Sequence, residues 1–171
     1  LMYENTAWAA KAEQETFIVV FPTSWKYRLT EDNTVADKWN SAGLHNIVVE
    51  GTELKDDVKF VQVMLDYLKL TFTVDEHRLY ATGFSNGGTG SVLYAARMPH
   101  RFAAVASLMG GGLPFFENDR PIDPSAIARI PFLFVHGASD ELIPASASER
   151  TAKAMRKAND GAVAEVHVLP G

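Results

Sequence analysis

The chain has 171 residues, of which 47% are hydrophobic and 22% charged, a composition typical of one globular domain with a substantial core. Its 16 basic against 21 acidic residues give a net charge of -5 with no basic run, which excludes nucleic acid as an expected partner. The absence of cysteine excludes disulfides and thiolate sites, and without a long apolar stretch or a signal-peptide pattern we expect no membrane segment.

The first third of the chain predicts one helix, one strand and a long loop. Residues 2–14 are rich in alanine and are typical of a helix, and the apolar run 17–21, closed by Pro22, is typical of a buried strand. Residues 23–51 have no hydrophobic period and predict an excursion over one edge of the domain. Loops of this length are often functional.

From residue 56 onward, helices and strands alternate. Asp56 or Asp57 is a suitable cap for a helix whose apolar face is formed by Val58, Val61, Leu65, Leu68 and Phe72. The elements that follow are a strand at 78–82, a helix at 85–98, strands at 103–109 and 131–135, a helix at 146–158 and a strand at 163–169. Ser146 and Glu149 have the spacing of a capping box.

This alternation predicts an α/β fold in which a mostly parallel sheet carries helices on both faces. The predicted strands are continuously apolar, as strands buried on both faces are. The sequence shows no internal repeat or linker, so we expect a single catalytic domain over residues 1–171. In such folds, ligands gather at the carboxyl ends of the strands.

A Gly-x-Ser-x-Gly motif lies between the strand at 78–82 and the helix that follows it. The motif runs from Gly83 to Gly87, with Ser85 at its centre. It places a serine on a sharp strand-to-helix turn, where we expect Gly83 and Gly87 to be needed because a β-carbon would clash. Ser85 is therefore the predicted nucleophile, although a glycine-flanked serine also occurs in ordinary turns.

The start of a helix next to this serine suits an oxyanion. Its free amide groups and the positive end of its dipole stabilise negative charge, and the backbone amide of Asn86 is the expected donor. Gly88 and Gly90 extend a small-residue surface on which we expect the helix to pack closely.

Asp140 is the predicted acid of a catalytic triad. It follows the strand at 131–135 in a loop at the same sheet edge as Ser85, and it comes after the serine in the chain. A carboxylate there would orient a histidine and stabilise its charged form. Glu141 and Asp123 are weaker candidates, and the alternative for Asp140 is a loop residue that caps a turn.

The sequence contains no obvious triad histidine. Only His167 follows Asp140, and it lies within the strand at 163–169, where a partly buried sheet histidine is expected instead of a base. His45, His77, His100 and His136 precede the acid and are more simply structural or surface residues. No pair of histidines has metal-ligand spacing, so we expect no metal and no other cofactor.

At these residues the chain resembles the polyhydroxybutyrate depolymerase and feruloyl or acetylxylan esterase group of α/β-hydrolases. The resemblance extends over nearly the whole chain and is carried by residues 17–22, 39–40, 56–61, 74–88, 99–106 and 136–140. It implies an α/β-hydrolase domain that lacks its first strands, where such enzymes carry a second oxyanion donor. It also implies a catalytic histidine beyond Gly171, and it favours a secreted protein.

The expected function is that of a serine carboxylic ester hydrolase acting through an acyl-serine intermediate. The resemblance implies feruloyl or acetyl esters of polysaccharides, or short hydroxyalkanoate polyesters, as substrates. A peptidase of the same fold and a non-catalytic polysaccharide- or polyester-binding homologue are the alternatives. Aromatic residues in two loops suit either an acyl pocket or ordinary packing: Trp25, Tyr27, Trp39, Phe115 and Phe116.

Overall fold

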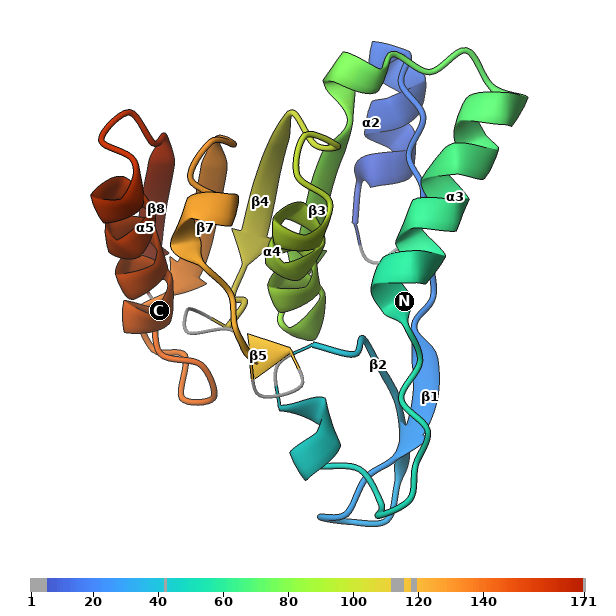
Figure 1. The fold of residues 1–171 in the computed structure, drawn as a ribbon, viewed down its shortest axis with the longest axis vertical. Coiled ribbons are helices and arrows are strands. Elements are labelled where there is room, and N and C mark those ends of the chain that lie inside the picture. Colours follow the sequence, from blue (N-terminus) through green and yellow to red (C-terminus); the bar gives the residue numbers. More distant parts are fainter. Residues whose placement is uncertain (1–5, 42, 112–115, 118–119, 171) are drawn as a thin grey trace.

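The computed structural model describes residues 6–41, 43–111, 116–117 and 120–170. At its centre lies a parallel sheet with the strand order β3-β4-β7-β8 (Figure 1). Its strands are β3 (Tyr80–Phe84), β4 (Ala104–Leu108), β7 (Phe132–Gly137) and β8 (Ala164–Leu169). Each overlaps one predicted strand, so the parallel sheet is confirmed. Because the strands are parallel, their carboxyl ends meet at one edge.

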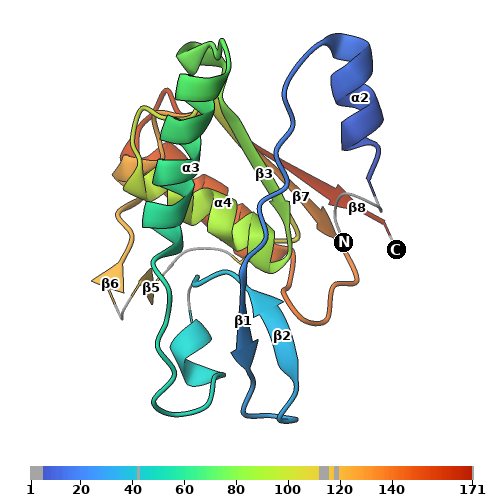
Figure 2. The same cartoon turned by 90° about the vertical axis from the view of Figure 1, so that its right-hand side faces the viewer.

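Helices lie on both sides of this sheet. One face carries α3 (Asp57–Thr71), α4 (Asn86–Arg97) and α5 (Ser146–Ala158), while α2 (Trp8–Glu15) stands on the opposite side (Figure 2). This arrangement confirms the predicted α/β fold with helices on both faces of a parallel sheet. The predicted first helix began at residue 2, and residues 2–5 lie outside the described part of the chain.

Short elements connect these layers. They are the hairpin strands β1 (Trp25–Arg28) and β2 (Val35–Lys38), the 3-10 helices η1 (Leu44–Asn46), η2 (Glu76–Arg78) and η3 (Pro124–Ala126), and the two-residue strands β5 (Phe116–Glu117) and β6 (Arg120–Pro121). Helix η2 occupies the beginning of the strand predicted at 78–82, so β3 begins at Tyr80.

The main core lies between the sheet and the helices α3, α4 and α5. Its most deeply buried side chains come from α4, β7, α5 and the end of η3, among them Val92, Phe134, Met155 and Ile127, which directly follows η3. Strand β7 alternates, with Phe132 and Phe134 buried and Leu133 36% exposed. The prediction of strands buried on both faces is therefore wrong for β7, because only the face under α4 and α5 is fully covered.

The strand predicted at 17–21 is absent. These residues form a connection from α2 to β1, with Phe17 and Ile18 about half exposed. A strand needs a neighbour for its backbone hydrogen bonds, and in the described sheet β3 pairs only with β4. The ring of Phe17 packs edge-on against Trp8 of α2, at 6.3 Å between centroids. An apolar run alone did not distinguish this packing from a strand.

The predicted loop at 23–51 contains the antiparallel β1–β2 hairpin and a small second core. Tyr27, Leu44 and Val48 are buried together there. The hydroxyl of Tyr27 accepts a hydrogen bond from the backbone N–H of Lys55 at 3.0 Å. The hairpin was not predicted, because its strands have only four residues each and one residue of β1 and none of β2 is fully buried.

Of the two predicted helix caps, that of α3 is confirmed and that of α5 is wrong. Asp56 caps α3 by accepting from the N–H of Lys59 at 2.8 Å, whereas Asp57 is buried and serves elsewhere. The capping box predicted for α5 is wrong, since its first amides donate to the backbone carbonyls of Pro144 and Ala145. Ser146 is thus already inside the helix, and its hydroxyl accepts from Arg150 at 2.9 Å.

We predict that Tyr27→Phe lowers the free energy of unfolding by about 1 kcal/mol, because the Lys55 N–H loses its acceptor. Urea unfolding measures the change. Tyr67→Phe, at an exposed position of α3, is the matched control and should change stability by less than about 0.5 kcal/mol. Equal effects of the two variants would contradict the proposed role of the Tyr27 hydroxyl.

Candidate active site

Ser85 occupies a strained turn between β3 and α4. Its backbone has φ +53° and ψ −120°, a region that residues with a β-carbon rarely adopt. The turn is held by two backbone hydrogen bonds, from Ser85 N–H to Leu108 O at 2.8 Å and from Thr89 N–H to Ser85 O at 3.0 Å. Such strain persists only where the surrounding structure imposes it, and it concentrates at functional sites.

The two motif glycines are not equivalent. A β-carbon on Gly83 would lie 2.2 Å from the backbone oxygen of Gly87, so glycine is required there. A β-carbon on Gly87 would meet nothing closer than the Trp39 ring at 3.9 Å, so the expected clash at Gly87 is wrong. The crowded helical position is Gly88, whose β-carbon would lie 3.0 Å from the backbone oxygens of Gly83 and Leu108.

Asn86 is the first residue of α4, where backbone N–H groups have no acceptor within the helix. Its amide therefore has no acceptor within α4, and the role of oxyanion donor stays a prediction. The side chain of Asn86 hydrogen-bonds to the backbone of Trp39 and to the Ser41 hydroxyl. Sequence reasoning missed these contacts because 45 and 47 residues separate the partners.

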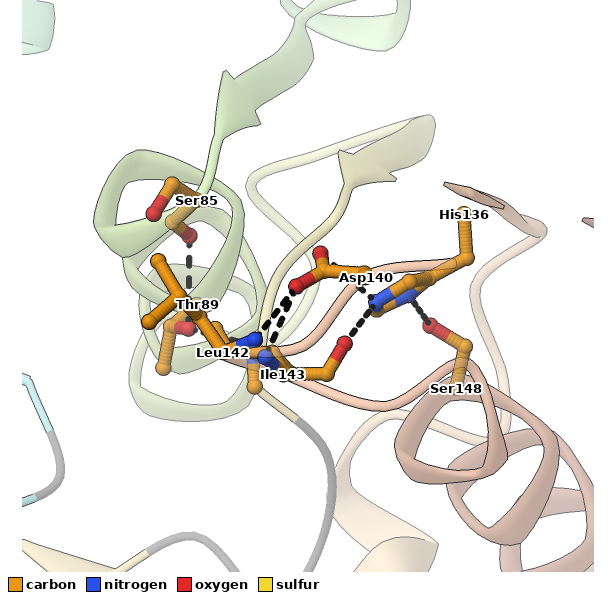
Figure 3. A network of polar contacts seen from close by, with 8 residues as sticks. Ser85, Thr89, His136, Asp140, Leu142, Ile143 and Ser148 are labelled. Atoms are coloured by element: carbon orange, nitrogen blue, oxygen red, sulfur yellow. Dashed lines mark hydrogen bonds and ion pairs between the residues drawn. The ribbon is translucent and has the colours of Figure 1, made fainter. Parts of the chain in front are cut away.

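Asp140 lies in the loop after β7, at the same sheet edge as Ser85 (Figure 3). Its Oδ1 accepts from the N–H groups of Ile143 at 2.9 Å and Leu142 at 3.0 Å. These bonds hold the pKa of the Asp140 carboxyl below its ordinary value, and the bond from Ile143 has the largest effect. The nearby His136 also lowers this pKa. The side chain is 16% exposed, so an ionised carboxylate is held at the edge of the loop.

His136, on β7, supports this loop from inside the protein. The ring is fully buried, and its Nε2 lies 2.6 Å from the Ile143 carbonyl oxygen and 3.4 Å from Asp140 Oδ2. Because a carbonyl only accepts, the neutral ring carries its proton on Nε2, and Nδ1 accepts from the Ser148 hydroxyl at 2.9 Å. The expected structural role is confirmed, although its link to Asp140 was not predicted.

Other predicted candidates lie elsewhere. His167 pairs in register with Val135 within the sheet, and its side chain is 58% exposed and 3.4 Å from Glu165, so the expectation that it is partly buried is wrong. Asp123 caps η3 through the N–H of Ser125, which lowers the pKa of its carboxyl. Glu141 is exposed.

The aromatic loop residues have different surroundings. Tyr27 lies in the second core and therefore lines no pocket. Trp25 is 56% exposed, with the ammonium group of Lys55 5.3 Å from its ring centroid. Trp39 lies against α4, close to Gly87. Phe115 lies outside the described residues, and for Phe116 the structure describes only the backbone.

The described residues contain no group of three or more histidine, cysteine, aspartate or glutamate side chains arranged to hold a metal ion. None of their helices is long and apolar enough to cross a membrane.

The chain is similar to a known protein family. The model of the dienelactone hydrolase family matches residues 14–171. The chain belongs to the dienelactone hydrolase family. This assignment is based on nearly the whole chain, including the β3 turn, the Asp140 loop and β8.

Several proteins that are similar to this chain have the names of ester-cleaving enzymes. It is 26% identical over 139 residues to a bifunctional acetylxylan esterase/xylanase of Neocallimastix patriciarum, covering 81% of this chain and 17% of that protein. It is 27% identical over 109 residues to poly(3-hydroxyalkanoate) depolymerase C of Paucimonas lemoignei, covering 64% and 24%. A relative from Aspergillus niger carries a feruloyl esterase name. The resemblance seen in the sequence is thereby confirmed.

A solved structure supports the fold. Arabidopsis thaliana SOBER1 superposes with a TM-score of 0.67 at 19% identity, covering 94% of this chain and 77% of that one. At this identity the likeness shows the fold alone. The chain spans less than a quarter of the length of the two curated relatives compared above.

We predict that Gly83→Ala lowers the free energy of unfolding by at least about 3 kcal/mol, because the new β-carbon overlaps the Gly87 carbonyl. Gly87→Ala is the matched control and should be neutral, or stabilising by up to about 1 kcal/mol, since alanine favours a helix interior. Urea unfolding of both variants measures this contrast. A Gly83→Ala protein as stable as the wild type would contradict the geometry of the turn.

A second prediction concerns Asp140 and pH. Because the folded protein lowers the pKa of this carboxyl, its ionised form stabilises the fold above the ordinary carboxyl range, and that contribution is lost as pH falls through the folded value. Asp140→Asn should therefore lower Tm at pH 7, and the difference should shrink below about pH 4. Thermal unfolding from pH 7 to pH 2.5 tests this, and a pH-independent difference would contradict it.

Proposed function

We propose that this chain carries the nucleophile and the acid of a serine carboxylic ester hydrolase, with Ser85 and Asp140 in these roles. The observation that supports this most strongly is the left-handed backbone of Ser85 at the start of α4. This conformation presents a serine hydroxyl beside free helix amides, as an esterase requires. The family and the esterase names of the relatives support ester hydrolysis as the class of activity.

In the proposed reaction, Ser85 Oγ attacks the ester carbonyl carbon and transfers its proton to an imidazole that the Asp140 carboxylate orients. The carbonyl oxygen becomes an oxyanion and accepts a hydrogen bond from the Asn86 N–H. Collapse of this intermediate breaks the ester C–O bond, and the alcohol leaves with the proton from the imidazole. Water then attacks the acyl-serine and releases the acid.

Neither His136 nor His167 is placed to be this imidazole. His136 is enclosed by Ile143, Ser148 and Asp140, and His167 lies within β8. We therefore assign the base to neither of these two histidines.

We propose acyl esters of polysaccharides, including acetyl and feruloyl esters, or short hydroxyalkanoate polyesters, as the substrates. The names of relatives support these classes. Trp39, whose ring lies close to Gly87, provides an aromatic surface next to the turn. Comparing acetyl, feruloyl and hydroxybutyrate esters with the corresponding amides separates these substrates and tests the peptidase alternative.

We predict that a fluorophosphonate forms one adduct on the wild-type protein and none on Ser85→Ala, because its phosphorus is attacked by an activated serine with loss of fluoride. Intact mass measures the adduct. Ser139→Ala, an exposed serine in the Asp140 loop, is the matched control and should be labelled like the wild type. No adduct on the wild type would overturn the esterase proposal and favour a binding protein.

Asp140→Asn should slow this labelling by at least about 100-fold, since the imidazole loses its orienting carboxylate. Asp123→Asn is the matched control, because Asp123 is another loop aspartate whose carboxyl accepts from a backbone amide, that of Ser125. Equal rates for Asp140→Asn and the wild type would remove Asp140 from the mechanism while leaving Ser85 in place.

A further inference from the structure

The side chain of Asn86 is fully engaged by a segment distant in sequence. Its Oδ1 accepts from Trp39 N–H at 2.7 Å, and its Nδ2 donates to Trp39 O at 3.2 Å and to the Ser41 hydroxyl at 2.8 Å. Both amide protons and the amide oxygen of the side chain are thus used. The residue that offers its backbone N–H to the oxyanion is therefore fixed through its side chain.

Asn40 anchors the same segment on its other side. Its backbone N–H donates to Asp57 Oδ2 at 2.6 Å, and its Nδ2 donates to the Lys55 carbonyl at 2.9 Å. Asp57 is 6% exposed, and burial is the main reason that the pKa of its carboxyl is raised. A buried carboxylate destabilises a fold unless it is hydrogen-bonded, so the hydrogen bond from Asn40 offsets part of the cost of burying Asp57.

Aromatic packing holds the segment between two helices. The Trp39 ring stacks on Phe60 of α3 at 6.3 Å between centroids and meets Tyr94 of α4 edge-on at 5.9 Å. Trp39, Asn40 and Ser41 thus form a bridge from the start of α3 to the start of α4. We call residues 39–41 the bridge segment.

The bridge segment is hydrogen-bonded to Asn86, the residue that follows the strained Ser85. The ψ angle of Ser85 sets the plane of the peptide that ends in the Asn86 N–H, and relaxation of this unfavourable backbone would rotate that plane. Three hydrogen bonds on the Asn86 side chain oppose such rotation. A donor displaced by about 1 Å costs on the order of 100-fold in rate, so small rotations matter.

We propose that Asn86, through its side chain, and Asp57, through Asn40, are positioning residues that hold the bridge segment and thereby aim the Asn86 amide at the oxyanion. This inference deepens the proposed esterase function and rests on it. Asp57 acts as a hydrogen-bond acceptor, so a neutral acceptor of the same shape serves equally well.

The test measures ester hydrolysis by the full-length protein, with kcat expressed per fluorophosphonate-titrated site. Asn86→Ala should lower kcat about 10- to 100-fold and leave KM within about twofold, because the donor acts on the transition state. Asp57→Leu should lower kcat in the same way, whereas Asp57→Asn should stay within about twofold of the wild type. Ser41→Ala, which removes one bond, should lower kcat about 2- to 5-fold and keep the test valid if Asn86→Ala does not fold.

The outcomes separate the two proposals. If the wild type is neither labelled nor active, the esterase function fails and this inference fails with it. If the wild type is active and Asn86→Ala and Ser41→Ala keep its kcat per site, the inference is overturned and the esterase function stands. Loss of folded protein without a change in kcat per site also overturns it, since that result reports a structural role alone. If Asp57→Asn lowers kcat as far as Asp57→Leu does, the proposed role of Asp57 as a hydrogen-bond acceptor is overturned.

Discussion

The positive φ of Ser85 is the constraint on which the site depends. It turns the chain from β3 into α4 within one residue, and it is imposed from the sheet, because the Ser85 N–H donates to Leu108 at the end of β4. The turn also needs space beneath it. A β-carbon on Gly110 would lie 2.3 Å from Ser107 Oγ and 2.8 Å from the backbone nitrogen of Thr89, so the chain after β4 passes close to α4. The Thr89 hydroxyl accepts from the Gly111 N–H at 2.6 Å and joins the two segments.

The loop after β7 that carries Asp140 is also held in place by contacts from inside the protein. A buried imidazole, not a strained backbone, organises it. His136 joins Ile143 to Ser148 of α5 and approaches Asp140, so the loop is built around a ring with no exposed surface. The carboxylate then receives two backbone N–H groups on one oxygen. Both halves of the candidate site are thus held by contacts behind them, as preorganised catalysis requires.

Sequence predicted well the elements whose signal is local. The strands of the main sheet are short apolar runs, α4 and α5 have the predicted extents within one residue or two, and Gly83 is required for the reason given by its motif. Failures occurred where distant contacts decide. The run at 17–21 lacks a paired strand, the 23–51 loop contains a hairpin with little burial, and a β-carbon on Gly87 would meet Trp39 only at van der Waals distance. The bridge from Asn86 to Trp39 joins residues that no local pattern relates.

The chain belongs to the dienelactone hydrolase family, and the strained Ser85 lies within the matched residues. The most direct test of the candidate site is a structure. We would determine the crystal structure of the full-length protein after fluorophosphonate treatment. We predict that the phosphorus is bonded to Ser85 Oγ, that φ of Ser85 stays near +53°, and that a phosphonyl oxygen lies about 2.7–3.1 Å from the Asn86 nitrogen. A relaxed Ser85 with negative φ, or a phosphonyl oxygen that points away from the Asn86 amide, would contradict the proposed site.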